Sequence, residues 1–152
     1  MLSARLVKII EEQADAMTRS LLKHFFTDIR IVAMRRLSEE DMYGRVYDVY
    51  HNLERWLGDK NEEAIAQRYA ELGRKRFREG IPLSEVILGQ ILIKDHLRDF
   101  IRTRALVDSA VQLYQEEELH LLVSHFFDRA IYHTVHGYEQ AAQLPRPAAA
   151  AS

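Results

Sequence analysis

The stretch EGIPLSEVILGQILIKDHLRDFIR, from Glu79 to Arg102, decides the fold class. Gly80 tolerates the left-handed backbone that often ends a helix, and Pro82 cannot continue a helix but suits the first turn of a new one. The residues from Val86 to Ile93 are apolar nearly all round, which is typical of a helix buried on most sides. We therefore predict one helix that ends near Gly80 and a second, central and most buried, over residues 83–102.

Amphipathic helices are predicted on both sides of this pair. Apolar residues recur at three- and four-residue steps over residues 2–25, 38–57 and 109–142. Ser38 with Asp41 resembles a capping box at the start of the second of these, and Gly58 suits its end. Residues 26–37 lack a clear period and are predicted to form a loop. With the helix that follows residue 61, the chain is predicted to be all-α, with about five helices in an antiparallel bundle.

The last helix is unusually long, since about 34 residues at about 1.5 Å each extend over about 50 Å. We expect either a kink near Gly137 or an end that projects as a connector or dimer arm. A single helical domain is predicted over residues 1–142. The closing residues 143–152, rich in Pro and Ala, are predicted to be a disordered tail or a linker stub.

Composition limits the classes of partner. The 152 residues include 21 Lys plus Arg, 23 Asp plus Glu and no Cys, and the formal net charge is -2. Without a basic excess, nucleic acid is not an expected partner. No apolar run approaches the roughly 18 residues of a membrane span, and the N-terminus lacks the apolar core of a signal peptide. The absence of thiols fits a reducing compartment. We therefore expect a cytoplasmic protein without a membrane segment.

The usual sequence signatures of catalysis are missing: there is no phosphate-binding loop, serine elbow, HExxH pair or dinucleotide fingerprint. A carboxylate lies three residues before a histidine twice, as Asp48 with His51 and as Glu117 with His120. Both residues of the first pair face away from the apolar stripe of their helix, which argues against a di-metal site. We predict a non-catalytic protein without a metal or cofactor.

Polar residues on apolar helix faces indicate an alternative function. Burying such a group without a partner costs about 1 to 3 kcal/mol, so a partner or a ligand is expected. Arg76, Gln90, Lys94 and His133 lie on the apolar faces of three successive helices. Three interpretations are open: these side chains pair with other polar groups in a structural network, line a pocket for a small ligand or anion, or lie at an oligomer interface. An iron or haem protein is a further alternative, with His96 or His133 as axial ligand.

Aromatic and charged residues beside two apolar stripes indicate a protein interface. Tyr43, Tyr47 and Tyr50 flank the core stripe of residues 38–57, where Tyr can bury its ring and keep its hydroxyl wet. His125 and Arg129 lie on one flank of the last helix, where a histidine with an unperturbed pKa of about 6.5 is suited to sensing pH. We predict a homodimer, or a complex with a regulatory protein, that uses these two flanks.

The residues around the Gly80 turn resemble a bacterial family. They are Arg74-x-Arg76 followed by Glu79-Gly80-Ile81-Pro82-Leu83, with NLERWL at residues 52–57 before them and the long last helix after them. From about Tyr43 to Gln140 the chain resembles the N-terminal helical sensory domain of RsbT co-antagonist proteins, which are stress-signalling scaffolds with a STAS domain downstream.

This resemblance implies a non-catalytic input module, related to non-haem globin-like sensors. Such a module dimerises and passes a signal through its last helix. Arg76 and Glu85 fall in the matching turn, and the resemblance implies that they are structural or signal-transmitting positions. Since the sequence ends at Ser152 before any STAS domain, we expect a stand-alone relative or a domain cut at its linker.

Overall fold

The computed structural model describes residues 4–58, 60–104 and 109–143. This part of the chain is all-helical, and no strand occurs in it. In chain order the elements are α1 (Ala4–Glu12), α2 (Ala14–Phe25), the 3₁₀ helix η1 (Ala33–Arg36), α3 (Glu39–His51), α4 (Leu53–Leu57), α5 (Glu62–Arg78), α6 (Leu83–Arg104) and α7 (Ala110–Gln143). The all-α class and the long C-terminal helix are confirmed. The tail predicted from residue 143 lies, beyond Gln143 itself, outside the described residues.

Seven α-helices occur in the described residues instead of about five, because two predicted helices are each divided by one residue. Gln13 separates α1 from α2, and its N–H lies between the carbonyls of Ile9 and Ile10, at 3.0 and 3.1 Å. Asn52 separates α3 from α4 with φ of -111° and ψ of 32°. One non-helical residue bends the chain and leaves the apolar stripe on the same side, so periodicity does not reveal it. The predicted loop over residues 26–37 contains η1.

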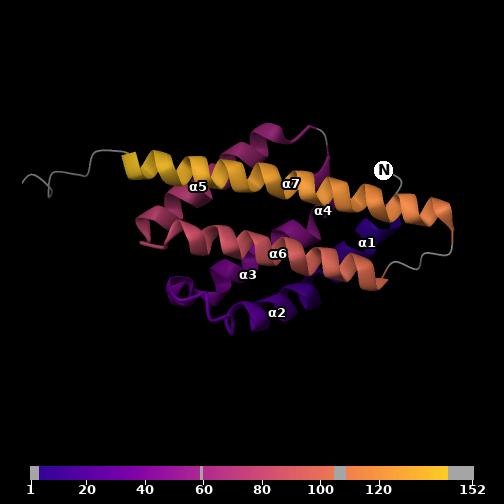
Figure 1. Ribbon diagram of the computed structural model, residues 1–152, viewed down its shortest axis with the longest axis horizontal. Helices are drawn as coiled ribbons and strands as arrows, with labels where there is room; N and C mark the ends of the chain where they lie inside the picture. Colours follow the sequence, from indigo (N-terminus) through magenta and orange to yellow (C-terminus); the bar gives the residue numbers. More distant parts are fainter. Residues whose placement is uncertain (1–3, 59, 105–108, 144–152) are drawn as a thin grey trace, which may run out of the picture.

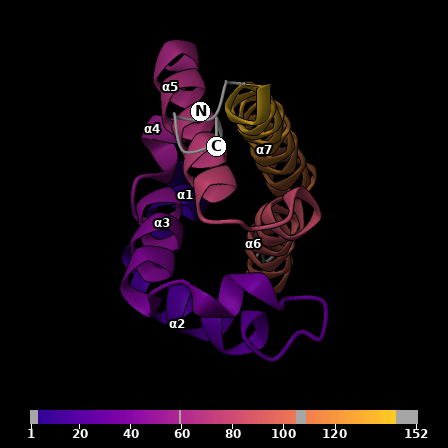
Figure 2. The same ribbon diagram turned by 90° about the vertical axis from the view of Figure 1, so that its left-hand side faces the viewer.

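The long helices lie in two groups around the core. α6 and α7 run antiparallel along the length of the molecule (Figure 1). Seen from one end, α3, α4 and α5 lie across the core from α6, and α2 lies along the edge between α3 and α6 (Figure 2). The main apolar cluster contains residues from every α-helix, α1 through α7, and includes Tyr50, Leu97 and Phe126. A smaller cluster lies beneath η1 and includes Phe25 and Met34.

The prediction that residues 83–102 form the most buried helix is wrong. α6 buries one face, with Val86, Gly89 and Leu97. Its flank with Ile87 and Ile91 is only half-buried. α2 is more buried, since six of its 12 residues are buried against six of the 22 residues of α6. A helix that is apolar nearly all round need not be covered on all sides, and here Ile87 and Ile91 border a depression on the surface.

α7 is neither kinked nor projecting near Gly137. It continues through Gly137 to Gln143 and packs there against α5. A Cβ atom at Gly137 would stand 2.0 Å from the Ala70 carbonyl oxygen, and one at Gly73 would stand 2.0 Å from the Thr134 carbonyl oxygen. These two glycines therefore let the backbones of α5 and α7 come into direct contact. None of the described helices is long and apolar enough to cross a membrane.

Candidate functional site

The Gly80 turn places Arg76 inside the molecule. α5 ends in a Schellman motif, in which Gly80 has a φ of 74° and the Ile81 N–H donates to the Arg76 carbonyl at 3.0 Å. Ile81 is buried and anchors the turn to the smaller apolar cluster. The predicted end of the helix is confirmed, and the side chain of Arg76 is only 2% exposed.

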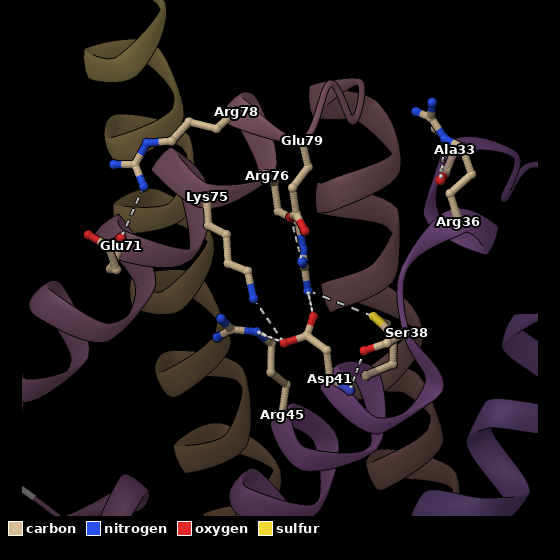
Figure 3. Close-up of polar contacts among 11 residues, drawn as sticks. Ala33, Arg36, Ser38, Asp41, Arg45, Glu71, Lys75, Arg76, Arg78 and Glu79 are labelled. Carbon is tan, nitrogen blue, oxygen red and sulfur yellow. Dashed lines mark hydrogen bonds and ion pairs between the residues drawn. The ribbon is translucent and has the colours of Figure 1, made fainter.

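Two carboxylates neutralise the buried guanidinium of Arg76 (Figure 3). Its Nη2 donates to Asp41 Oδ2 at 2.8 Å, and its Nη1 donates to Glu79 Oε1 at 2.7 Å. Asp41 also accepts from Lys75 Nζ at 3.1 Å and lies 3.6 Å from Arg45 Nε. Burial raises the pKa of Asp41, but the hydrogen bonds from Arg76 and Lys75 outweigh it, so the pKa lies below its ordinary value.

The first turn of α3 holds Asp41 in this position. The Asp41 N–H donates to Ser38 Oγ at 3.0 Å, so the predicted cap at Ser38 is confirmed. A carboxylate in the first helical turn also interacts favourably with the helix dipole. Asp41 is therefore a cap residue and the acceptor that joins α3 to the last turn of α5.

A cavity of about 50 Å³ lies beside this network, among α3, α5, α6, α7 and η1. It lies where the two apolar clusters meet, and side chains from both line it. At about 12 Å³ for each water-sized group, it has room for about four such groups. The apolar part of the lining consists of Met34, Met42, Val46, Val49, Leu72, Val86, Ile93 and Phe127.

Three arginines also line this apolar cavity, namely Arg45, Arg68 and Arg76. Arg45 and Arg68 line a depression on the outer surface as well, so they stand between the cavity and solvent. Arg68 pairs with Asp48 at 3.1 Å, and its guanidinium lies 5.4 Å from the centre of the Trp56 ring. Burial lowers the pKa of Arg45, and the neighbouring charge of Arg76 lowers it further.

Three buried polar atoms around the cavity have no hydrogen-bond partner among the described residues. They are Arg45 Nε, Arg68 Nε and Gln90 Oε1. The Thr134 hydroxyl donates to the Ala130 carbonyl at 2.7 Å, so it accepts from Gln90 Nε2, also at 2.7 Å. This arrangement fixes the Gln90 amide and leaves its oxygen unpaired. Two donors and one acceptor thus lack a hydrogen bond, and one of the donors, Arg45 Nε, has only its ion pair with Asp41 at 3.6 Å.

The predicted pocket residues are only partly brought together. Arg76 and Gln90 line the cavity, whereas Lys94 and His133 are half-buried and do not belong to its lining. His133 Nε2 lies 3.3 Å from Oε1 of Glu62, the first residue of α5. The inward position on this turn of α7 belongs to Thr134, one residue later.

The predicted interface residues on α3 are differently placed. Tyr50 is fully buried, and its hydroxyl donates to the Ile93 carbonyl at 2.9 Å instead of remaining in water. Tyr43 donates to Asp15 Oδ1 on α2, and its ring stacks on that of Tyr47, with 5.4 Å between centroids. Tyr50 is therefore a core residue of this chain. Tyr43 links α3 to α2, and Tyr47 stacks between Tyr43 and His51 on α3.

Glu85 and the α7 residues occupy three different environments. The Glu85 carboxylate is buried beneath η1. Arg129 Nη1 donates to Glu62 Oε2 at 2.6 Å, which ties α7 to the start of α5. His125 is exposed on α7.

The iron or haem alternative named His96 or His133 as axial ligand. No group of three or more His, Asp or Glu side chains there is suited to hold a metal ion. His96 lies on an open depression beside Met17 and Phe100, and neither His96 nor His133 lines the apolar cavity.

Sequence reasoning missed Arg45, Arg68 and Asp48 as parts of the site. Asp48 was expected to face solvent, but it accepts from Trp56 Nε1 at 3.1 Å as well as from Arg68. A signal was present in Arg45, which lies three residues after Met42 and four after Asp41 on α3. Contact with Arg68 of α5 depends on how the two helices pack, which the sequence pattern does not give.

Comparisons with known proteins give one finding about relationship. The family described as RsbT co-antagonist protein rsbRD N-terminal domain matches residues 15–149. The match runs from α2 through α7 and includes every residue that lines the cavity. No curated protein and no solved structure matches the chain.

Proposed function

The chain belongs to the RsbT co-antagonist rsbRD N-terminal domain family, and from this premise we propose that it is a non-catalytic sensory domain of bacterial stress regulation. It acts in the cytoplasm through contacts with proteins, and its first partner is a second copy of itself. The family is a regulatory one, which supports the role in signalling. The outer face of α7 supports the mode of action.

The observation that carries this proposal is an apolar line on the solvent side of α7. Tyr114, Leu121 and Tyr132 are 67%, 72% and 63% exposed. At about 100° per residue they lie within about 20° of one another on the helix, and directly opposite the buried line through Ala130. A helix with apolar residues on two opposite faces is suited to pack on the core with one and on a partner with the other. His125 lies on the same outer flank.

Sedimentation velocity on the chain and its Leu121→Glu variant tests the proposal. We expect a dimer at micromolar concentration. Placing a carboxylate at the centre of the apolar line should weaken the dimer by at least about tenfold, since central interface residues carry most of the binding energy. Ile29→Glu is the matched control, because Ile29 is 88% exposed and lies far from α7 in sequence, before η1. A monomer at high micromolar concentration would contradict the proposal.

A second candidate function is the binding of a small ligand in the cavity. Arg45 Nε, Arg68 Nε and Gln90 Oε1 favour it, because none of the three has a hydrogen-bond partner among the described residues and buried polar groups usually have one. Native mass spectrometry of the protein from its own cells tests it. We expect a small molecule that is retained in the folded protein and released on denaturation. A protein that carries no small molecule in the folded state would count against this function.

A further inference from the structure

We propose that the cavity binds a short-chain monocarboxylate, with its carboxylate at Arg45 and Arg68 and its hydrocarbon chain among the apolar residues. This inference rests on the second candidate function and names its ligand class. It does not depend on the dimer.

The lining of the cavity is positively charged. Arg45, Arg68 and Arg76 belong to it, and no Asp or Glu does. The carboxylates that pair with these arginines are Asp41, Asp48 and Glu79, and they lie outside the lining. An anion that enters the cavity therefore meets guanidinium groups and no carboxylate of the lining.

Two donors without a hydrogen-bond partner place the anion. Among the described residues, Arg45 Nε and Arg68 Nε are buried and have no such partner, although Arg45 Nε lies 3.6 Å from Asp41 Oδ1. Both side chains line the cavity and the outer depression. They come from α3 and α5, so an anion that binds between them joins the two helices. A guanidinium donates favourably to a planar carboxylate, and such charge-assisted bonds are stronger than neutral ones.

The remainder of the lining selects an apolar chain. Away from the arginines, the walls are mostly aliphatic, thioether and aromatic, with Val49, Val86 and Phe127 among them. The other polar side chains of the lining are those of Tyr69 and Gln90. A hydrated inorganic anion would leave these walls without contacts. The cavity has room for about four water-sized groups, which corresponds to a chain of about three to four carbons beyond the carboxyl group.

Gly89 contributes no side chain to the cavity wall. It lines the cavity from α6, and a Cβ atom there would stand 3.4 Å from a Phe25 ring carbon and 3.5 Å from the Met34 methyl group. These are ordinary contacts, so alanine is accommodated. Gly89→Ala should therefore leave the fold intact, because alanine is the better helix former, and should fill part of the space that the ligand needs.

The experiment is a calorimetric titration of the intact chain with sodium carboxylates from formate to octanoate, and with the primary alcohols of equal length. We expect saturable binding of carboxylates, with affinity that rises about fourfold for each methylene until the cavity is full. Alcohols should bind at least about tenfold more weakly, since they lack the charge. Octanoate should bind more weakly than butyrate or pentanoate.

Three variants and one control locate the ligand. Arg45→Gln and Arg68→Gln should each weaken butyrate binding by about tenfold or more. Gly89→Ala should weaken it without loss of thermal stability, and this variant tests the site even if an arginine variant fails to fold. Arg74→Gln is the matched control, because Arg74 pairs with Glu71 outside the cavity.

Four outcomes would overturn the proposal: no saturable binding by any carboxylate, equal binding of alcohols and carboxylates, affinity that is independent of chain length, or unchanged affinity in Gly89→Ala. If native mass spectrometry finds a bound molecule of another class while carboxylates fail, the ligand class is wrong and ligand binding stands. The oligomeric state from sedimentation is unaffected by any of these results.

Discussion

Glu85 is the residue whose carboxylate holds the segment before α3 against α6. Its two oxygens accept from the N–H groups of Val32, Ala33 and Met34, at 2.8, 3.1 and 3.2 Å. Burial raises the pKa of Glu85, but these backbone hydrogen bonds outweigh it, so the pKa lies below its ordinary value. The ionised carboxylate thus caps the first N–H groups of η1, which have no partner within the helix.

The Glu85→Gln variant should be less stable by about 1 to 3 kcal/mol at pH 7, because an amide offers only one acceptor oxygen to three donors. The difference from the parent chain should shrink as the pH falls below about 4.5, because the unfolded parent chain binds a proton at Glu85 there and the folded chain binds one only at lower pH. Urea unfolding at pH 7 and at acidic pH measures both effects. Glu139→Gln, on the exposed face of α7, is the control. Equal stability of Glu85→Gln and the parent chain at pH 7 would contradict the role of the carboxylate.

At the scale of elements, the crossing of α5 and α7 depends on two glycines. The backbone of each helix occupies the space that a side chain at Gly73 or Gly137 would need. Near this crossing, the Thr134 hydroxyl of α7 accepts from Gln90 of α6, which lines the cavity.

Gly137→Ala should destabilise the fold by about 3 kcal/mol or more, which is the upper end of the cost of overpacking, because the helices must move apart. Gly44→Ala is the matched control on α3, where an added Cβ meets nothing within 4 Å. It should stabilise the chain by about 0.5 to 1 kcal/mol, since glycine weakens a helix interior. Denaturant unfolding of both variants checks the pair. If Gly137→Ala were as stable as Gly44→Ala, the close crossing would be wrong.

At the scale of the whole molecule, stability should fall in two steps as the pH is lowered. Burial lowers the pKa of His96 and of His120, so the folded chain keeps both histidines neutral where the unfolded chain binds protons. Stability is therefore lost as the pH falls below about 6.5. Asp41 and Glu85 have lowered pKa values in the fold, so a second loss follows below about 4.5.

Thermal unfolding between pH 8 and pH 3 measures both steps. The combined His96→Gln and His120→Gln variant should lose the first step and keep the second. His125→Gln, which changes an exposed histidine, should keep both. If the combined variant still loses stability in the first step, groups other than His96 and His120 cause that step.

The sequence by itself determined the helices, several of their ends and the family. Ser38 and Gly80 act through local backbone chemistry, and the stripe from Met42 to Trp56 is buried as its spacing predicts. Arg76 was identified because a charge on an apolar face requires a partner. These features depend on neighbours in sequence or on periodicity, which a single chain displays directly.

Only the tertiary structure decided which polar residues meet. Arg45 of α3 and Arg68 of α5 line one cavity with Gln90 of α6, and the sequence spacing between them carries no sign of it. On α7, Thr134 faces inward and contacts Gln90, whereas His133, one residue earlier, lies beside Glu62. The crossing of α5 and α7 is set by two glycines 64 positions apart. Contacts between helices depend on packing angle and approach, and these are properties of surfaces that form only when the whole chain has folded.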